Sequence, residues 1–209
     1  MIDDEVQALL ARLRDIETEL EEKLAEGRED LEYRLEKKRV IFETSVLAQH
    51  RRLKTSLIRF IRQSPWLALV TSPVVYSLVV PIALLDALVW LYQRICFFVW
   101  NIPRVRRADY IALDRHNLAY LNGVQKLNCV YCGYANGVIA YTREVASRSE
   151  QFWCPIKHAL RVREPHRRYR NFLEFGDAEG FRDRLESLQA EVRQIRPRQP
   201  GSGRSGPRD

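Results

Sequence analysis

Residues 66–85 read WLALVTSPVVYSLVVPIALL, twenty residues without a charged side chain. A helix of this length can cross the hydrocarbon core of a bilayer, which is about 30 Å thick. After Asp86 the apolar sequence resumes and reaches Trp100 with Arg94 as its only charged residue. The aromatic side chains in this stretch resemble those found at membrane–water interfaces: Trp66, Trp90, Tyr92 and Trp100. We therefore predict that residues 64–103 form a membrane segment.

The path of this segment depends on its prolines and its flanking charges. Pro73 and Pro81 predict kinks or breaks, and the apolar stretch is too long for one upright span and short for two. Arginines flank it on both sides, and basic residues favour the cytoplasmic side. The pattern therefore favours a membrane-embedded helical hairpin or re-entrant element bent near Pro81, with both soluble parts cytoplasmic. A single kinked helix from Trp66 to about Leu91 is the alternative.

Apolar residues repeat every eleven positions in the first sixty residues. One ladder is Leu9, Leu20, Leu31, Phe42 and Leu53, and a second is Leu13, Leu24, Leu35, Val46 and Leu57. Eleven residues in three turns is close to the period of an α-helix, so the ladders form one stripe on a helix. We predict a continuous helix over 3–62 in a coiled-coil domain over 1–63. Because so long a stripe needs a partner, we expect a homo-oligomer formed through this helix.

Three of the four cysteines lie within 26 residues of one another. Cys129 and Cys132 are separated by two residues, and Cys154 and His158 by three. Two pairs of this kind can supply four tetrahedral ligands to Zn²⁺ with no open position, which is typical of a structural site. We predict a structural zinc bound by these four residues, and no catalytic residue. The alternatives are a Cys129/Cys132 redox dithiol that Cys154 resolves, and buried or incidental thiols.

Short helices are predicted on either side of the first cysteine pair. The apolar periodicity indicates one helix over 109–125 and another over 137–152, with a turn between them. His116 and His166 are possible substitute ligands, although each has a looser spacing to the cysteines. We expect these elements to form a helical Cys/His module over 104–175.

Two segments around the cysteines carry a family resemblance. They are NCVYCGYANG at residues 128–137 and QFWCPIKH at residues 151–158. Together they resemble the signature of an uncharacterised family of bacterial membrane proteins, over roughly residues 108–160 and the membrane segment before them. The resemblance implies a bacterial inner (plasma) membrane and a module built around these cysteines. It implies no activity.

Charge is distributed unevenly along the chain. Residues 1–50 carry 14 acidic and 8 basic side chains, whereas residues 101–209 carry 20 basic and 12 acidic ones. A basic run follows the cysteine module: Arg161, Arg163, Arg167, Arg168 and Arg170. Beside a membrane segment it could contact anionic lipid, while nucleic-acid binding is less favoured because no motif for it is present. We expect an amphipathic helix over 176–196 and a disordered tail over 197–209.

These patterns favour a non-enzymatic function. Our leading hypothesis is a membrane-anchored adaptor or scaffold that binds protein partners near the bilayer. The alternatives are a thiol redox enzyme or sensor that uses Cys129 and Cys132, and an accessory subunit of a membrane complex with Asp86 in a shared interface. If Asp86 is not part of such an interface, we expect it to lie near the membrane surface or to pair with Arg94. No Gly-rich phosphate loop, Ser/His/Asp set or paired-carboxylate motif supports hydrolase, kinase or transferase chemistry.

Overall fold

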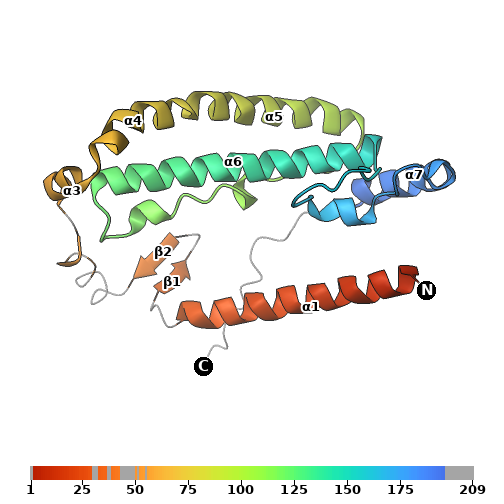
Figure 1. The fold of residues 1–209 in the computed structure, drawn as a ribbon, viewed down its shortest axis with the longest axis horizontal. Helices are drawn as coiled ribbons and strands as arrows, with labels where there is room; N and C mark the ends of the chain where they lie inside the picture. The colour runs from red at the N-terminus through yellow and green to blue at the C-terminus, as the bar shows by residue number, and fades with distance from the viewer. Residues whose placement is uncertain are drawn as a thin grey trace. The chain divides into compact units, whose positions relative to one another are not determined.

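The computed structural model describes residues 2–29, 33–36, 39–42, 50, 52–54 and 56–195. These residues form mainly helices, together with a two-stranded sheet (Figure 1). The prediction of a mainly α-helical protein is confirmed. The chain divides into two compact units, Met1–Gln63 with Asp114–Lys126 and Ser64–Leu113 with Leu127–Asp209. The tail predicted over 197–209 lies outside the described residues.

The first unit begins with a helix and a hairpin. Helix α1 (Ile2–Glu29) precedes two antiparallel strands, β1 (Tyr33–Glu36) and β2 (Arg39–Phe42). A short helix, α3 (Leu57–Gln63), ends this part of the unit.

The hairpin overturns the prediction of one continuous helix over 3–62. Tyr33 lies opposite Phe42, and Leu35 lies opposite Val40. Aromatic and β-branched residues such as these favour strands, which is a physical reason for the change from helix to strand. The eleven-residue spacing indicated a stripe but did not exclude a break in the helix.

Helix α1 keeps the first part of the predicted apolar stripe. The side chains of Leu9, Leu13 and Leu20 are all exposed. The ladder positions Leu31 and Val46 lie outside the described residues. These three positions of the stripe are therefore uncovered within the described residues, and self-association through the stripe stays a prediction.

In the second unit the apolar segment forms two consecutive helices. Helices α4 (Trp66–Ser77) and α5 (Val79–Val99) are separated by Leu78 alone and run in the same direction (Figure 1). Pro81 lies in the first turn of α5, where a backbone N–H has no helical partner to lose. The hairpin bent near Pro81 is therefore not formed. The geometry corresponds to the alternative of a kinked, continuous helix.

Helix α6 (Gly123–Trp153) lies beside α5 and runs parallel to it (Figure 1). Residue numbers of contacting residues rise together along α4, α5 and α6: Val75 with Tyr131, Asp86 with Tyr134, and Trp100 with Phe152. Residues 101–113 form a return segment, which leads back along α6 and contains the 3₁₀ turn η1 (Arg107–Asp109). The predicted helix over 137–152 is confirmed as part of α6. The predicted helix over 109–125 is wrong, because that stretch holds only 3₁₀ turns before α6 begins.

Two glycines of α6 let the return segment approach the helix closely. A Cβ atom on Gly137 would lie 2.9 Å from the Ile111 Cα and from the Tyr110 carbonyl oxygen. A Cβ atom on Gly133 would lie 3.1 Å from the Ala112 carbonyl oxygen. Because backbone atoms cannot move aside like a flexible side chain, the absent Cβ atoms permit this packing.

The chain beyond α6 packs back against its end. Ile156 forms a parallel bridge with Leu173, and the Leu173 N–H donates to the Pro155 carbonyl at 2.8 Å. Helix α7 (Ala178–Arg193) then begins at Asp177, whose side chain accepts a hydrogen bond from the Gly180 N–H at 2.8 Å. The amphipathic helix predicted within 176–196 is thus confirmed.

One hydrophobic core joins α5, the return segment, α6 and α7. Its buried members are Phe97, Ile102, Val105, Tyr141, Val145, Phe152 and Val192. This core lies toward the C-terminal ends of α5 and α6. It fixes one side of α5 against protein and leaves the other side of the helix uncovered.

Candidate functional site

The predicted metal ligands are spread along α6. Cys129 is half-buried and Cys132 exposed within the helix, while Cys154 is exposed just after its end. At ~1.5 Å per residue, the 22 positions from Cys132 to Cys154 correspond to about 33 Å. Ligands of one tetrahedral zinc lie about 4 Å apart. The structure therefore does not bring the two predicted pairs together, and it places Cys154 far from the dithiol that it was expected to resolve.

The histidines have other partners. The ring of His158 stacks on Tyr169 with 6.1 Å between centroids, and its backbone N–H donates to the Tyr169 hydroxyl at 2.6 Å. His166 Nε2 lies 2.8 Å from the Glu150 carboxylate. Among the described residues no group of three or more His, Cys, Asp or Glu side chains could hold a metal ion. Zinc binding stays a prediction from the ligand spacing.

The inner side of α5, which faces α6, carries a buried carboxylate. Arg107 Nε donates to Asp86 Oδ1 at 2.9 Å, Arg107 Nη2 donates to Oδ2 at 2.6 Å, and the Tyr134 hydroxyl donates to Oδ2 at 3.0 Å. The hydrogen bond to Asp86 raises the pKa of Arg107, so the guanidinium stays charged. The expected pairing of Asp86 with Arg94 is wrong, because Arg94 lies over the ring of Trp90 at 5.4 Å. With both oxygens bonded inside the unit, Asp86 is not available to a shared interface.

A buried amide fixes the return segment about two turns further along α5. Gln93 Oε1 accepts from the Val105 N–H at 3.0 Å, and Gln93 Nε2 donates to the Val105 carbonyl at 3.3 Å and to the Tyr141 hydroxyl. The Tyr92 hydroxyl also lies 2.8 Å from Ser149 Oγ. Asp86, Tyr92 and Gln93 of α5 are thus directed toward α6 and the return segment.

A second ion cluster lies on α6. Glu144 accepts hydrogen bonds from Arg148 Nε at 2.9 Å and from both terminal nitrogens of Arg168 at 2.8 Å. Burial alone would raise the pKa of Glu144, but the hydrogen bonds and positive charges of Arg168 and Arg148 outweigh it and lower that pKa. Arg148 also donates to the Pro103 carbonyl, which connects the cluster to the return segment.

The outer side of α4 and α5, away from α6, is a continuous apolar surface. We define the outer stripe as the exposed residues Leu67, Val70, Val74, Val80, Leu84, Leu88, Leu91, Ile95 and Phe98. Their spacing of three or four residues, apart from the step across the junction of the two helices, places them on one helical side. Residues Trp66–Val99 are long and apolar enough to cross a membrane, and almost none of their hydrophobic window is buried. Exposed apolar surfaces of this extent mark contact with a membrane or another protein.

The hydroxyl groups of α4 are satisfied within its own unit. Thr71 Oγ1 donates to the Leu67 carbonyl at 2.8 Å, and Ser72 and Ser77 donate to carbonyls three residues earlier at 2.8 and 2.7 Å. The Tyr76 hydroxyl donates to the Asn128 side chain. In hydrocarbon, polar groups need internal partners because water is absent. The hydroxyls of α4 therefore meet the requirement of an apolar solvent.

The arginines of the predicted basic run have two different environments. Arg168 holds Glu144 and also donates to Ser147 Oγ at 2.9 Å, so it belongs to the fold. Arg161 and Arg163 are exposed. The roles of Arg107 and Arg168 were missed from the sequence, because each depends on a carboxylate more than 20 residues away.

Comparison with known proteins gives no relative. No family model, curated protein or solved structure matches this chain. The resemblance to a bacterial membrane family through the cysteine signature therefore stays a prediction. The function is therefore inferred from the contacts and exposed surfaces of the described residues.

Proposed function

We propose that this protein is a monotopic membrane scaffold, anchored by α4 and α5 lying in the plane of a bilayer with their outer stripe in the hydrocarbon. The observation that carries the proposal is the division of one helix into two sides. The outer stripe is apolar and uncovered, while Asp86 and Gln93 on the inner side are buried against protein. With its inner side covered by protein, α5 can lie at the boundary of lipid and water with its outer side in the hydrocarbon.

The combined length of α4 and α5 favours a helix that lies in the plane of the membrane over one that crosses it. The 34 residues of Trp66–Val99 would extend about 51 Å at ~1.5 Å per residue. To cross a hydrocarbon core of about 30 Å, this rod would need a tilt of about 54°, beyond the usual range of 0–40°. A helix that lies in the plane has no such length limit.

The neighbours of α5 argue in the same direction. Because α6 runs beside α5, a crossing would carry into the bilayer the charged residues of the second half of α6: Arg143, Glu144, Arg148 and Glu150. The return segment would add Arg104, Arg106 and Arg107. A charged residue at the bilayer centre costs about 3 kcal/mol in a helix. In the plane, all of these groups stay on the water side of α5.

The scaffolding part of the proposal concerns protein partners. The exposed leucines of α1 suit self-association in a coiled coil, which would present several copies of the anchor to one membrane. We place the water-facing layer in the bacterial cytoplasm, on the basis of the basic residues and the cysteine signature in the sequence. A redox enzyme is not favoured, since Cys154 lies at the other end of α6 from the CxxC pair.

Depth measurements on the full chain test the in-plane anchor. Single nitroxide labels at Val70, Leu84 and Ile95, each in a cysteine-free background, are compared by their accessibility to oxygen and to a water-soluble nickel complex. An in-plane helix gives the same shallow depth at all three sites. A span gives the greatest depth at Leu84, and that profile would overturn the arrangement.

A charge in the outer stripe tests membrane binding itself. Leu84→Asp with Leu88→Asp should abolish binding of the full chain to vesicles, because two carboxylates would then face hydrocarbon. Leu160→Asp is the matched control, since Leu160 is 83 % exposed but lies outside the stripe. Equal loss of binding in the control, or none in the double variant, would contradict the proposal.

A further inference from the structure

The C-terminal end of α5 is shaped by a helix-ending motif. Trp100 caps the helix and Asn101 follows with φ of 56°, in the left-handed region that asparagine tolerates. The Ile102 N–H donates to the Phe97 carbonyl at 2.8 Å, and the Asn101 N–H donates to the Phe98 carbonyl at 3.3 Å. These two bonds define a Schellman motif, with Ile102 and Phe97 buried together as its hydrophobic contact. The motif turns the chain back over the helix that it has just left.

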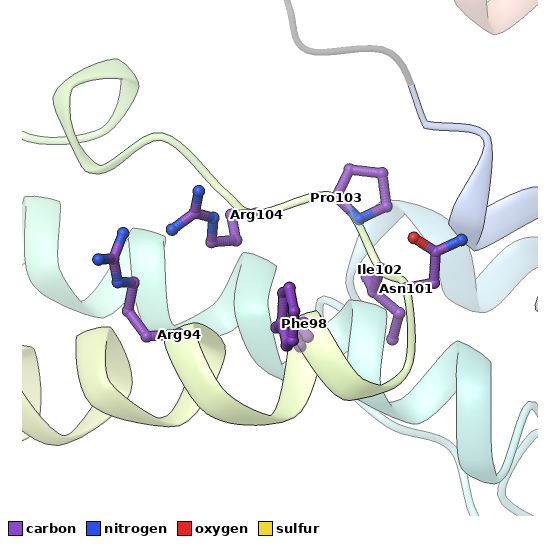
Figure 2. A pocket seen from close by; sticks show the side chains of 7 residues that line it. Arg94, Phe98, Asn101, Ile102, Pro103 and Arg104 are labelled. Carbon is purple, nitrogen blue, oxygen red and sulfur yellow. The ribbon is translucent and has the colours of Figure 1, made fainter.

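This reversal creates a pocket beside the outer stripe. The pocket has a volume of about 530 Å³ and is lined by Arg94, Phe97, Phe98, Asn101, Ile102, Pro103 and Arg104. Figure 2 shows Arg94 rising from α5 and Arg104 extending from the return segment toward the same side of the helix, with Phe98 further along α5 toward the turn. Phe98 is 83 % exposed and continues the outer stripe into the pocket. The pocket therefore combines two guanidinium groups with an apolar wall.

The two arginines are available to an external anion. In the part of the chain that the structure describes, neither Arg94 nor Arg104 has an ion pair with a carboxylate. The nearby arginines differ, because Arg106 lies 3.9 Å from Asp109 and Arg107 holds Asp86. A guanidinium binds phosphate oxygens through two parallel N–H groups. Two uncompensated guanidiniums at one pocket thus favour a phosphate ligand.

We infer that this pocket binds the headgroup phosphate of an anionic glycerophospholipid, with the acyl chains lying along Phe98 and the outer stripe. The inference rests on the in-plane anchor, which brings the pocket to the level of the headgroups. The apolar wall distinguishes a lipid from free phosphate, for which such a wall offers nothing. Trp90 and Trp100 beside the pocket are typical of the same interfacial level.

Vesicle binding of the full chain tests the inference. Wild-type protein is titrated with vesicles of phosphatidylcholine alone and with vesicles of equal parts phosphatidylcholine and phosphatidylglycerol. The double variant Arg94→Gln/Arg104→Gln should lose roughly 25-fold in affinity for the anionic vesicles, about five-fold for each arginine. Its affinity for the neutral vesicles should not change. Both arginines are exposed, so the variant should fold, as circular dichroism will check.

The matched control removes the same charge elsewhere. Arg182→Gln/Arg184→Gln alters two exposed arginines of α7 and should leave both affinities as in the wild type. If the two double variants weaken the affinity for anionic vesicles equally, the binding depends on net charge alone. That result would overturn the headgroup pocket. Arginine-dependent binding of inorganic phosphate in the absence of vesicles, as tight as that of the lipid, would assign a free anion and would also overturn it.

The outcomes separate this inference from the proposed function. If the wild type binds no vesicle of either composition, the membrane anchor itself fails. If it binds neutral and anionic vesicles equally well, the anchor stands and the headgroup pocket fails. Tighter anionic binding that depends on Arg94 and Arg104 supports both.

Discussion

The inner and outer sides of α5 have opposite surroundings. On the inner side Asp86 and Gln93 are buried and bonded to the return segment and α6. On the outer side Leu84 and Leu88 are more than half exposed. An apolar helix with a few polar residues can therefore be one wall of a folded unit. Its remaining side then determines what the unit contacts.

Among the ion pairs, the Glu144 cluster should give the largest loss of stability, because it is the most buried ion group of the inner layer. Glu144→Gln removes the charge that neutralises Arg148, whose side chain is 9 % exposed. Breaking a buried pair from one side costs about 3 kcal/mol. We expect that decrease in the free energy of unfolding, measured with urea in mild detergent.

The same cluster predicts a pH dependence with a definite sign. The pKa of Glu144 is lower in the folded protein than its ordinary value of 4.5. Its contribution to stability is therefore fully present above pH 4.5 and is lost as the pH falls below that value through the folded pKa. Glu144→Gln should show a flatter acid decline than the wild type, and an equally steep decline in both would contradict the assignment.

Asp86→Asn should have the next largest effect, and it tests the inner side of α5 directly. The amide keeps the size of the side chain but loses the charge that binds Arg107 in a two-point contact. Because Arg107 is 45 % exposed and can be hydrated, we expect about 2 kcal/mol rather than the full cost of a buried pair. Arg94→Gln is the control on the outer side, where no ion pair is lost. Equal destabilisation by both substitutions would remove the distinction between the two sides.

Local patterns predicted several elements of this unit, and non-local contacts explain the rest. The 3.6-residue periodicity predicted the helices around Val145 and Val192, where each buried position follows from its neighbours in sequence. Cys129 and Cys132 illustrate the limit of a spacing motif. Two cysteines three positions apart can lie in a metal-binding turn, and they can equally lie one turn apart on a helix. The periodicity of Tyr134, Val138 and Tyr141 through this region was the signal that favoured the helix.

The pairing of Asp86 could not be read from the sequence. Arg94 and Arg107 were both available to it, and only the return path of the chain after α5 selects Arg107. The polar residues of an apolar helix therefore indicate which side is inner, but the partner depends on the fold. Likewise, the ladder on residues 3–62 did not indicate the two strands, because strand pairing joins residues such as Tyr33 and Phe42 that lie nine positions apart.

Glycine substitutions along α6 measure how tightly the inner layer is packed. Gly137→Ala should destabilise by about 1 kcal/mol, since overpacking against the backbone of Ile111 exceeds the gain in helix propensity. Gly133→Ala should have a smaller effect, because its closest contact is 3.1 Å instead of 2.9 Å. Gly123→Ala is the control, with nothing within 4 Å, and should be neutral or slightly stabilising. Thermal unfolding midpoints in any other order would contradict the close approach of the return segment.

The smallest effect on stability is expected on the outer side, at Leu88. Its side chain is 54 % exposed, so Leu88→Ala leaves no internal cavity and should change the free energy of unfolding in detergent by less than about 0.5 kcal/mol. The same substitution removes apolar surface from the lipid contact, so it should weaken vesicle binding measurably. Phe97→Ala, on the inner side and fully buried, should do the reverse: it should lower stability by about 3 kcal/mol. A cost at Leu88 as large as that at Phe97 would mean that protein, not lipid, covers the outer stripe, because only a packed protein surface leaves a cavity when a side chain is truncated.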